Sequence, residues 1–288
     1  MSSDARPIGV FDSGMGGLTV LSAMEARLPA ERFLYLGDTA RLPYGTKSAA
    51  TVEAYALAAT RLLIAEGVKM VVVACNTASA VALERLTREL APVPVIGVIE
   101  PGARAGVAAT RNNHIAVIAT EGTVKGGAYV RAIHALSGDI DVVQQPCQVF
   151  VALAEEGWTD SEVTRTAAKR YLGPLFRGAS APDTLVLGCT HFPVLAAAIR
   201  GVIGTGVAMV DSAATTAAAV ADALAAQGMG VAESGAHGAP TRGAPTSGAR
   251  TRFLATDSPE RFARVGEIFL GRPIAASDVE LVDLRSLP

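Results

Sequence analysis

The sequence predicts an α/β protein made of two similar α/β domains, each a mostly parallel sheet flanked by helices. Short β-branched runs alternate with alanine-rich helical stretches along the 288 residues, a pattern typical of parallel strands joined by crossover helices. Several runs are apolar throughout, as expected of strands covered by helices on both faces. A repeat of two strand motifs in the second half of the chain indicates two such domains rather than one long sheet.

The predicted strands are short apolar runs that end in polar turns, at residues 8–11, 33–36, 70–74, 93–98, 115–119, 140–144, 184–187 and 207–210. Helices are predicted between them wherever large apolar residues recur at helical spacing. Residues 77–90 and 192–203 show this spacing most clearly, and a final helix is expected over residues 260–270.

The repeat consists of two pairs of similar segments in the same order. Ile8-Gly-Val-Phe-Asp-Ser-Gly resembles Ile115-Ala-Val-Ile-Ala-Thr-Glu-Gly, and Val71-Val-Val-Ala-Cys-Asn-Thr resembles Leu185-Val-Leu-Gly-Cys-Thr-His. In each segment an apolar strand ends in a polar turn. Buried strands can also look alike through composition alone, so this second interpretation of the repeat stays open.

The repeat leads to a division of the chain into domains. We place residues 1–98 and 208–288 in the first α/β domain and residues 99–207 in the second. Residues 233–251, which are rich in Gly, Ala, Pro, Thr and Ser, are expected to form a flexible loop inside the first domain. The chain after this loop is expected to pack back onto the first domain.

Composition excludes several classes of function. Half of the residues are hydrophobic, 18% are charged and the net charge is −2, so we expect no basic surface for nucleic acid. The apolar runs are too short to span a membrane, and the first residues lack the pattern of a signal peptide. The three cysteines do not form a disulfide framework. We therefore expect a cytoplasmic protein with free thiols, no nucleic-acid partner and no membrane contact.

Two of the three cysteines occupy equivalent places. Cys75 and Cys189 each follow a buried strand and precede a helix, and ligands bind beyond the carboxyl ends of such strands. The helix N-terminus is expected to lower the pKa of each thiol. A lone buried cysteine is commonly a small apolar residue, and Cys147, which follows Pro146, is interpreted in this way.

Racemisation is a reaction with a physical need for two acid–base groups. The α-proton leaves one face of the carbon and a proton arrives on the other, so a single base cannot reach both faces. A disulfide oxidoreductase would instead favour Cys-X-X-Cys, which is absent from the sequence. Two thiols, one protonated and one deprotonated, can carry out racemisation in either direction.

Polar residues near the two thiols are candidates for tuning them. Asp12 lies in the segment Gly9-Val-Phe-Asp-Ser-Gly-Met-Gly-Gly, which fits neither a dinucleotide fingerprint nor a phosphate-binding loop. Asp12 could equally be a turn or capping residue, and Asn76 and Thr77 could be helix caps. His191 follows Cys189 closely enough to act as a general acid, although a lone histidine is commonly a hydrogen-bonded core residue.

Four motifs resemble the glutamate racemase family. They are Phe11-Asp-Ser-Gly-Met-Gly-Gly-Leu-Thr-Val, Tyr35-Leu-Gly-Asp-Thr-Ala-Arg-Leu-Pro-Tyr-Gly, Val73-Ala-Cys-Asn-Thr-Ala-Ser and Leu187-Gly-Cys-Thr-His-Phe-Pro. The resemblance implies an isomerase with its active site at the domain interface, glutamate as substrate, and neither a cofactor nor a metal. It also implies supply of D-glutamate for peptidoglycan in the cell wall, which maintains cell shape, and it admits a homodimer.

The resemblance also implies roles for individual residues. The position of Cys75 abstracts the proton from D-glutamate and that of Cys189 from L-glutamate, with Asp12 assisting the first thiol. His191 and a glutamate of Ala154-Glu-Glu-Gly assist the second, and we choose Glu155 over Glu156. The implied substrate-binding residues are Asp12, Ser13, Tyr44, Gly45, Asn76, Thr77, Thr123, Thr190 and His191, although Tyr44 and Gly45 could also belong to an ordinary Pro-Tyr-Gly turn.

The sequence departs from the family pattern in two places and leaves other functions open. Glu121 stands where a neutral residue is expected, and the segment 233–251 is longer than the family's connection. An aspartate racemase would use the same two thiols on a shorter substrate, and a regulatory binding protein would retain the fold without catalysis. A pyridoxal-phosphate racemase would need a Schiff-base lysine, and none of Lys47, Lys69, Lys125 and Lys169 has a recognisable setting.

Overall fold

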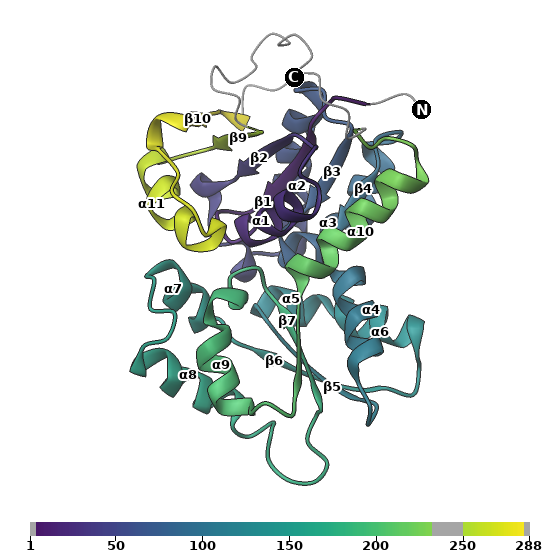
Figure 1. Cartoon of the computed structure of the whole chain (residues 1–288), viewed down its shortest axis with the longest axis vertical. Helices are drawn as coiled ribbons and strands as arrows, with labels where there is room; N and C mark the ends of the chain where they lie inside the picture. The colour runs from purple at the N-terminus through teal and green to yellow at the C-terminus, as the bar shows by residue number, and fades with distance from the viewer. Residues whose placement is uncertain (1–3, 232–249, 285–288) are drawn as a thin grey trace.

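Two parallel sheets organise the chain, one above the other in the view of Figure 1. The structure, a computed structural model, describes residues 4–231 and 250–284. The first sheet has the order β10-β9-β2-β1-β3-β4 and the second has the order β6-β5-β7-β8. Four strands of the first sheet therefore repeat the order of the second, which confirms the predicted pair of similar α/β domains.

The strands begin and end close to where the apolar runs predict. The first sheet contains β1 (Ile8–Asp12), β2 (Phe33–Gly37), β3 (Met70–Val73), β4 (Val95–Gly97), β9 (Thr251–Ala255) and β10 (Val279–Leu281). The second contains β5 (His114–Ala119), β6 (Asp141–Pro146), β7 (Thr184–Gly188) and β8 (Ala208–Asp211). The two strands β9 and β10 were not among the predicted ones.

Helices connect and cover the strands. The α-helices are α1 (Leu18–Arg27), α2 (Ala49–Ala65), α3 (Asn76–Glu89), α4 (Ile99–Ala109), α5 (Glu121–Gly126), α6 (Ala128–Leu136), α7 (Val149–Glu155), α8 (Glu162–Leu172), α9 (Ala196–Ile203), α10 (Ser212–Ala226) and α11 (Pro259–Leu270). Short 3₁₀ helices are η1 (Thr39–Arg41), η2 (Tyr44–Thr46), η3 (Phe192–Leu195) and η4 (Ala276–Asp278). The predicted helix over residues 192–203 thus begins as a 3₁₀ turn, which is common at helix ends.

Packing on both faces explains why the central strands are apolar throughout. Met70 and Val72 of β3 pack into one apolar cluster with α1, whereas Val71 and Val73 pack into another with α2 and α3. Every residue of β1, β2, β3 and β7 is buried. Alternation of polar and apolar residues disappears because neither face of these strands meets water.

The pairing of β8 corrects one predicted domain boundary. Residues 208–211 were placed in the first domain, but β8 pairs with β7 from Thr184↔Ala208 to Leu187↔Asp211 in the second sheet. The following helix α10 packs against α1 of the first sheet. We therefore propose that the chain returns to the first domain after Asp211, while the boundary at residue 98 stays a prediction.

The loop predicted over residues 233–251 lies almost entirely outside the described residues. Arg250 and Thr251 are described, and Thr251 already belongs to β9. The segment that follows rejoins the first sheet, since β9 pairs with β2 and β10 pairs with β9. Among the described residues, no helix combines the length and the apolar character needed to cross a membrane.

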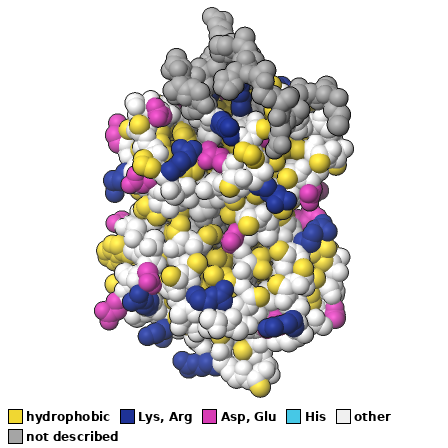
Figure 2. Space-filling model, viewed as in Figure 1, with side chains coloured by type: hydrophobic (Ala, Val, Ile, Leu, Met, Phe, Trp, Pro, Cys, Tyr) yellow, Lys and Arg dark blue, Asp and Glu magenta, His cyan; other side chains and the backbone are white. Residues whose placement is uncertain are grey.

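The surface carries charges of both signs. On the face shown in Figure 2, Lys and Arg side chains are interspersed with Asp and Glu side chains over both halves of the molecule. A buried ion pair contrasts with this surface. Lys69 Nζ lies 2.6 Å from Glu31 Oε2, and the side chains are 0% and 3% exposed.

The buried ion pair ties four segments together. Lys69 Nζ also donates to the carbonyl oxygens of Asp4 and Met229, both at 2.8 Å. Glu31 Oε1 accepts the backbone N–H of Val231 at 2.9 Å. The pair thereby joins the segments that precede β1, β2 and β3 to the segment that follows α10.

We expect Lys69→Met to lower the free energy of unfolding by about 3–5 kcal/mol, because it leaves the Glu31 carboxylate buried without its counter-charge. Chemical denaturation followed by circular dichroism measures the change. The exposed Lys169→Met provides the control and should stay within about 0.5 kcal/mol of the parent protein. A cost for Lys69→Met as small as that of the control would contradict this interpretation.

Candidate functional site

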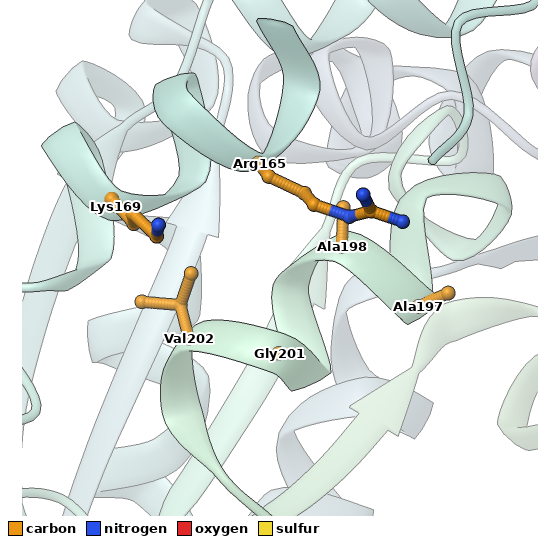
Figure 3. A pocket seen from close by; sticks show the side chains of 6 residues that line it. All are labelled: Arg165, Lys169, Ala197, Ala198, Gly201 and Val202. Atoms are coloured by element: carbon orange, nitrogen blue, oxygen red, sulfur yellow. The ribbon is translucent and has the colours of Figure 1, made fainter. Parts of the chain in front are cut away.

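One cavity on the surface contains none of the predicted site residues. It has a volume of about 190 Å³ between α8 and α9 and is lined by Arg165, Lys169, Ala197, Ala198, Gly201 and Val202 (Figure 3). We therefore locate the site from the distribution of the predicted side chains rather than from this cavity.

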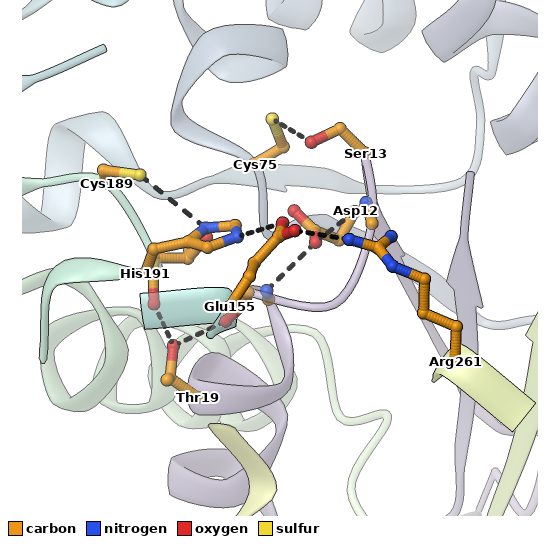
Figure 4. Close-up of polar contacts among 12 residues, drawn as sticks. Asp12, Ser13, Thr19, Cys75, Glu155, Cys189, His191 and Arg261 are labelled. Carbon is orange, nitrogen blue, oxygen red and sulfur yellow. Dashed lines mark hydrogen bonds and ion pairs between the residues drawn. The ribbon is translucent and has the colours of Figure 1, made fainter. Parts of the chain in front are cut away.

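The predicted reactive residues gather at the carboxyl ends of equivalent strands, as Figure 4 shows. Asp12 is the last residue of β1, Cys75 follows β3, and Cys189 follows β7. In the matching sheet orders β3 and β7 occupy the same position, next to the central strands β1 and β5. The repeat in the sequence thus places one thiol at the corresponding point of each half.

Cys75 is a buried N-cap. Its Sγ accepts the N–H of Ala78 at 3.4 Å at the start of α3 and donates to Ser13 Oγ at 3.3 Å. Burial and the nearby Asp12 carboxylate nevertheless raise the pKa of the Cys75 thiol to about 12. The sequence-based expectation of a lowered pKa is wrong for this residue, because desolvation outweighs one backbone N–H and one hydroxyl.

Asp12 is held by its own loop. Its Oδ2 accepts the N–H groups of Gly14 at 3.0 Å and Gly17 at 3.1 Å, and the hydroxyl of Tyr35 at 3.3 Å. Burial raises the pKa of Asp12, while the charge on His191 opposes the shift. A Cβ at position 17 would lie 2.7 Å from Asp12 Cβ, so glycine is needed there for this close approach.

Cys189 has a different set of partners. Its Sγ lies 3.8 Å from His191 Nδ1, and His191 Nε2 lies 3.1 Å from Glu155 Oε1. Burial disfavours the charged ring, but contacts with Cys189 and Glu155 outweigh it and raise the pKa of His191 to about 10. The structure places Glu155 against His191, whereas Glu156 is exposed at the end of α7.

The helix α11 contributes two side chains to this half of the site. Arg261 Nη2 donates to Glu155 Oε2 at 2.7 Å. The ring of Phe269 meets the His191 ring edge-on, with 4.9 Å between the centroids. Burial acts to raise the pKa of the Glu155 carboxyl, but His191 and Arg261 outweigh it and lower that pKa.

A cluster of threonines joins the two halves. Thr77 Oγ1 lies 2.9 Å from Thr120 Oγ1 and 3.3 Å from Thr123 Oγ1, and the last two hydroxyls lie 3.0 Å apart. Gly45 packs so closely here that a Cβ would lie 2.9 Å from Thr120 Cβ. The predicted residues Gly45, Thr77 and Thr123 are therefore brought together.

Asn76 also bridges the halves. Its Nδ2 donates to the hydroxyl of the buried Tyr129 at 2.9 Å, while its Oδ1 is buried without a hydrogen-bond partner. Thr190, which follows Cys189 in the sequence, is buried, and its carbonyl oxygen accepts the hydroxyl of Thr19 at 3.0 Å. The free acceptor on Asn76 is available to a ligand with an N–H or O–H donor.

The side chains of Tyr44 and Glu121 are paired with residues outside the predicted site. The Tyr44 hydroxyl donates to Asp38 Oδ2 in a very short hydrogen bond, so this hydroxyl is already paired. Glu121 is exposed in the first turn of α5 and pairs with Lys125 at 2.6 Å. An acid is favourable at a helix N-terminus, which accounts for this departure from the family pattern.

The sequence analysis assigned no role to several residues of the site. Tyr35, Thr120, Tyr129 and Arg261 all contact predicted site residues. Tyr35 and Tyr129 were hidden in apolar segments, where a tyrosine hydroxyl that needs a buried partner is the only signal. Arg261 lies 106 residues from its partner in a helix with no motif. In the described segments, no group of three or more His, Cys, Asp or Glu side chains is arranged to hold a metal ion.

Comparison with known proteins yields close relatives. Residues 8–220 match the Asp/Glu/Hydantoin racemase family. The glutamate racemase of Geobacter metallireducens is 46% identical over 281 residues, which cover 98% of both chains.

Solved structures give the same result. Glutamate racemase from Francisella tularensis in complex with D-glutamate has a TM-score of 0.86 and 35% identity, with 99% of this chain and 100% of that chain covered. The Thermus thermophilus glutamate racemase in complex with β-chloro-D-alanine has a TM-score of 0.84 and 42% identity, with the same coverage. The similarity therefore extends over both halves of the fold.

We expect the His191 ring to titrate near pH 10 in an NMR experiment, far above the value of about 6.5 for a free imidazole. Glu155→Gln should lower this pKa because it removes the negative charge that holds the proton. Since the folded-state pKa is raised, the stability difference between parent and variant should be full below about pH 6.5 as long as the Glu155 carboxylate is ionised, and it should disappear as the pH rises through about 10. Titration of His191 near pH 6.5 in both proteins would contradict the assignment.

Proposed function

Because the chain belongs to the Asp/Glu/hydantoin racemase family, we propose that it interconverts L- and D-glutamate by proton transfer between the substrate α-carbon and two thiols. The chain is an isomerase by this membership. The observation that carries the mechanism is the placement of Cys75 and Cys189 at equivalent strand ends with different partners. No cofactor takes part in the proposed steps.

The two thiols have different charged neighbours. The pKa of Cys75 is raised to about 12, so Cys75 holds its proton at neutral pH. A protonated His191 places a positive charge 3.8 Å from Cys189 Sγ, where it offsets the negative charge of a thiolate. A protonated Cys75 opposite a thiolate at Cys189 is the arrangement needed to convert L-glutamate into D-glutamate.

In this direction the Cys189 thiolate takes the α-proton of L-glutamate and becomes a thiol. The electron pair of the broken C–H bond remains on the α-carbon and is delocalised into the adjacent carboxylate. Cys75 then donates its proton to the opposite face of the carbon and becomes a thiolate. The developing charge is met by fixed hydrogen-bond donors rather than by reorienting water.

The reverse direction uses the same groups with exchanged roles. A Cys75 thiolate takes the α-proton of D-glutamate, and Cys189 returns a proton from the other face. Ser13 is within 3.3 Å of Cys75 Sγ and can donate to the thiolate once the thiol proton has left. Asp12 acts on Cys75 through its charge, since the contacts of its Oδ2 are with Gly14, Gly17 and Tyr35.

The polar groups between the halves suit an amino-acid substrate with a second carboxylate. The unpaired Asn76 Oδ1 can accept from the α-ammonium group. The hydroxyls of Thr77, Thr120 and Thr123 can donate to a carboxylate, as can the predicted binding residues Ser13 and Thr190. Tyr44 and Gly45 are proposed to contribute through their backbone because the Tyr44 hydroxyl is taken by Asp38.

The cellular role follows from the product. We propose that the enzyme supplies D-glutamate for peptidoglycan synthesis and acts in the cytoplasm. A homodimer remains one proposed assembly. Aspartate is the competing substrate, because the same two thiols would act on it, and the identity to glutamate racemases favours the longer substrate.

We expect the pure protein to bring the circular dichroism of L-glutamate to zero without added cofactor and to leave L-aspartate unchanged. Cys75→Ala and Cys189→Ala should each lower the rate by at least about 10³-fold, within the range attributed to a positioned acid or base. Cys147→Ala provides the matched control with a buried thiol outside the proposed mechanism and should retain activity.

Other results would separate the alternatives. Turnover of aspartate alone would preserve the mechanism and overturn the substrate. Binding of glutamate without α-proton exchange in heavy water would indicate a binding protein. A Cys75→Ala or Cys189→Ala variant with the parent rate would contradict the two-thiol mechanism.

A further inference from the structure

The helix α11 belongs to the first domain in its packing but contacts the acid–base group of the second. It packs against α1 and β10 and lies directly above α7 in Figure 1. From there Arg261 reaches Glu155 and Phe269 reaches the His191 ring. The group beside Cys189 is therefore completed by a segment from near the end of the chain.

We propose that Arg261 is a positioning residue for the Cys189 half of the reaction, holding Glu155 so that Glu155 in turn holds His191 beside Cys189. This inference rests on the proposed function and adds to it a residue that no recognised motif contains. Figure 4 shows the four side chains as one continuous series, from Arg261 through Glu155 and His191 to Cys189.

The geometry assigns each carboxylate oxygen of Glu155 to one partner. Oε2 accepts from Arg261 Nη2 at 2.7 Å, and Oε1 faces His191 Nε2 at 3.1 Å. The second ring nitrogen of His191 faces Cys189 Sγ at 3.8 Å. Fixing Oε2 thereby fixes the direction of Oε1, and the direction of Oε1 sets the orientation of the imidazole ring.

The charge of Arg261 and its positioning of Glu155 are separate contributions. The groups whose charges act on His191 are Cys189, Glu155 and Asp12, from the ends of β7, α7 and β1. Arg261 acts through Glu155, whose pKa it helps to lower. Loss of Arg261 would raise the pKa of Glu155 and remove a positive charge, and neither change by itself lowers the pKa of His191. The pKa of the ring falls because the freed Glu155 carboxylate turns away from His191 Nε2, which it now meets at 3.1 Å.

The effect should be confined to one half of the reaction. Cys75 contacts Ser13 and the Ala78 N–H, which belong to the β1 loop and α3 rather than to α11. Loss of Arg261 therefore slows the proton transfers of Cys189 and leaves those of Cys75 unchanged. Because the equilibrium constant of racemisation is one, kcat/KM falls equally in both directions, and isotope effects are needed to locate the slowed step.

The test compares Arg261→Ala, Arg261→Lys and the control Arg264→Ala, in which the altered side chain is exposed on the same helix. We expect kcat to fall about 10-fold in Arg261→Ala, the scale seen when an orienting partner is removed, and to recover largely in Arg261→Lys. Because the freed Glu155 no longer contacts His191, the high-pH limb of the rate profile should move to lower pH in Arg261→Ala. Arg264→Ala should match the parent protein.

Deuterium isotope effects on kcat/KM give the decisive readout. In Arg261→Ala the effect should increase for α-deuterated L-glutamate, whose proton goes to Cys189, and decrease for α-deuterated D-glutamate, whose proton goes to Cys75. A loss of stability alone would change neither. In a Glu155→Gln background, Arg261→Ala should add no further loss, since the two residues act in series.

The possible negative results distinguish failure of the proposed function from failure of the role of Arg261. A parent protein that racemises no glutamate would overturn the proposed function. An active parent with an unchanged Arg261→Ala variant would overturn only the role of Arg261. Isotope effects that increase equally for both enantiomers, or full additivity with Glu155→Gln, would likewise show that Arg261 does not act through Glu155 on Cys189.

Discussion

The burial of two thiols at the carboxyl ends of β3 and β7 is the constraint on which the rest of the site depends. Parallel strands end at one edge of a sheet, and a repeated sheet order places the same strand end at the same point in each half. Because burial disfavours a thiolate, each sulfur needs polar support from its surroundings. The loops after β1 and β7 provide that support. They pack so closely against the supporting side chains that a Cβ at position 16 or 17 would clash, so both positions need glycine.

The support differs between the halves, although the folds match. Ser13 and a helix N-terminus surround Cys75, whereas a histidine, a glutamate and an arginine stand in series behind Cys189. A symmetrical arrangement would give both thiols the same charge state. The observed asymmetry lets one thiol keep its proton while a positive charge stands beside the other, which a proton relay between two faces requires.

The sequence predicted the parts of this arrangement that depend on local pattern. Apolar runs located the eight strands of the two matching halves, and the strand-to-Cys motif located both thiols. The pKa of Cys75 was predicted in the wrong direction, because the degree of burial and the approach of Asp12 depend on how the halves pack. β9, β10 and Arg261 were missed because their partners are distant in sequence and no local signal marks them.

The central claim is that two thiols act on opposite faces of the α-carbon, and early incorporation of solvent deuterium tests it most directly. L-Glutamate would be incubated with the protein in heavy water, and both enantiomers would be analysed by mass spectrometry during the first turnovers. In the two-thiol account, Cys75 donates a deuteron that came from the solvent, so D-glutamate should be fully deuterated at the α-carbon. A thiol carries a single proton, and Cys189 holds the one it has just removed, so recovered L-glutamate should be almost free of deuterium. D-Glutamate that retains the original proton, or equal labelling of both enantiomers from the start, would indicate a single base and contradict the account.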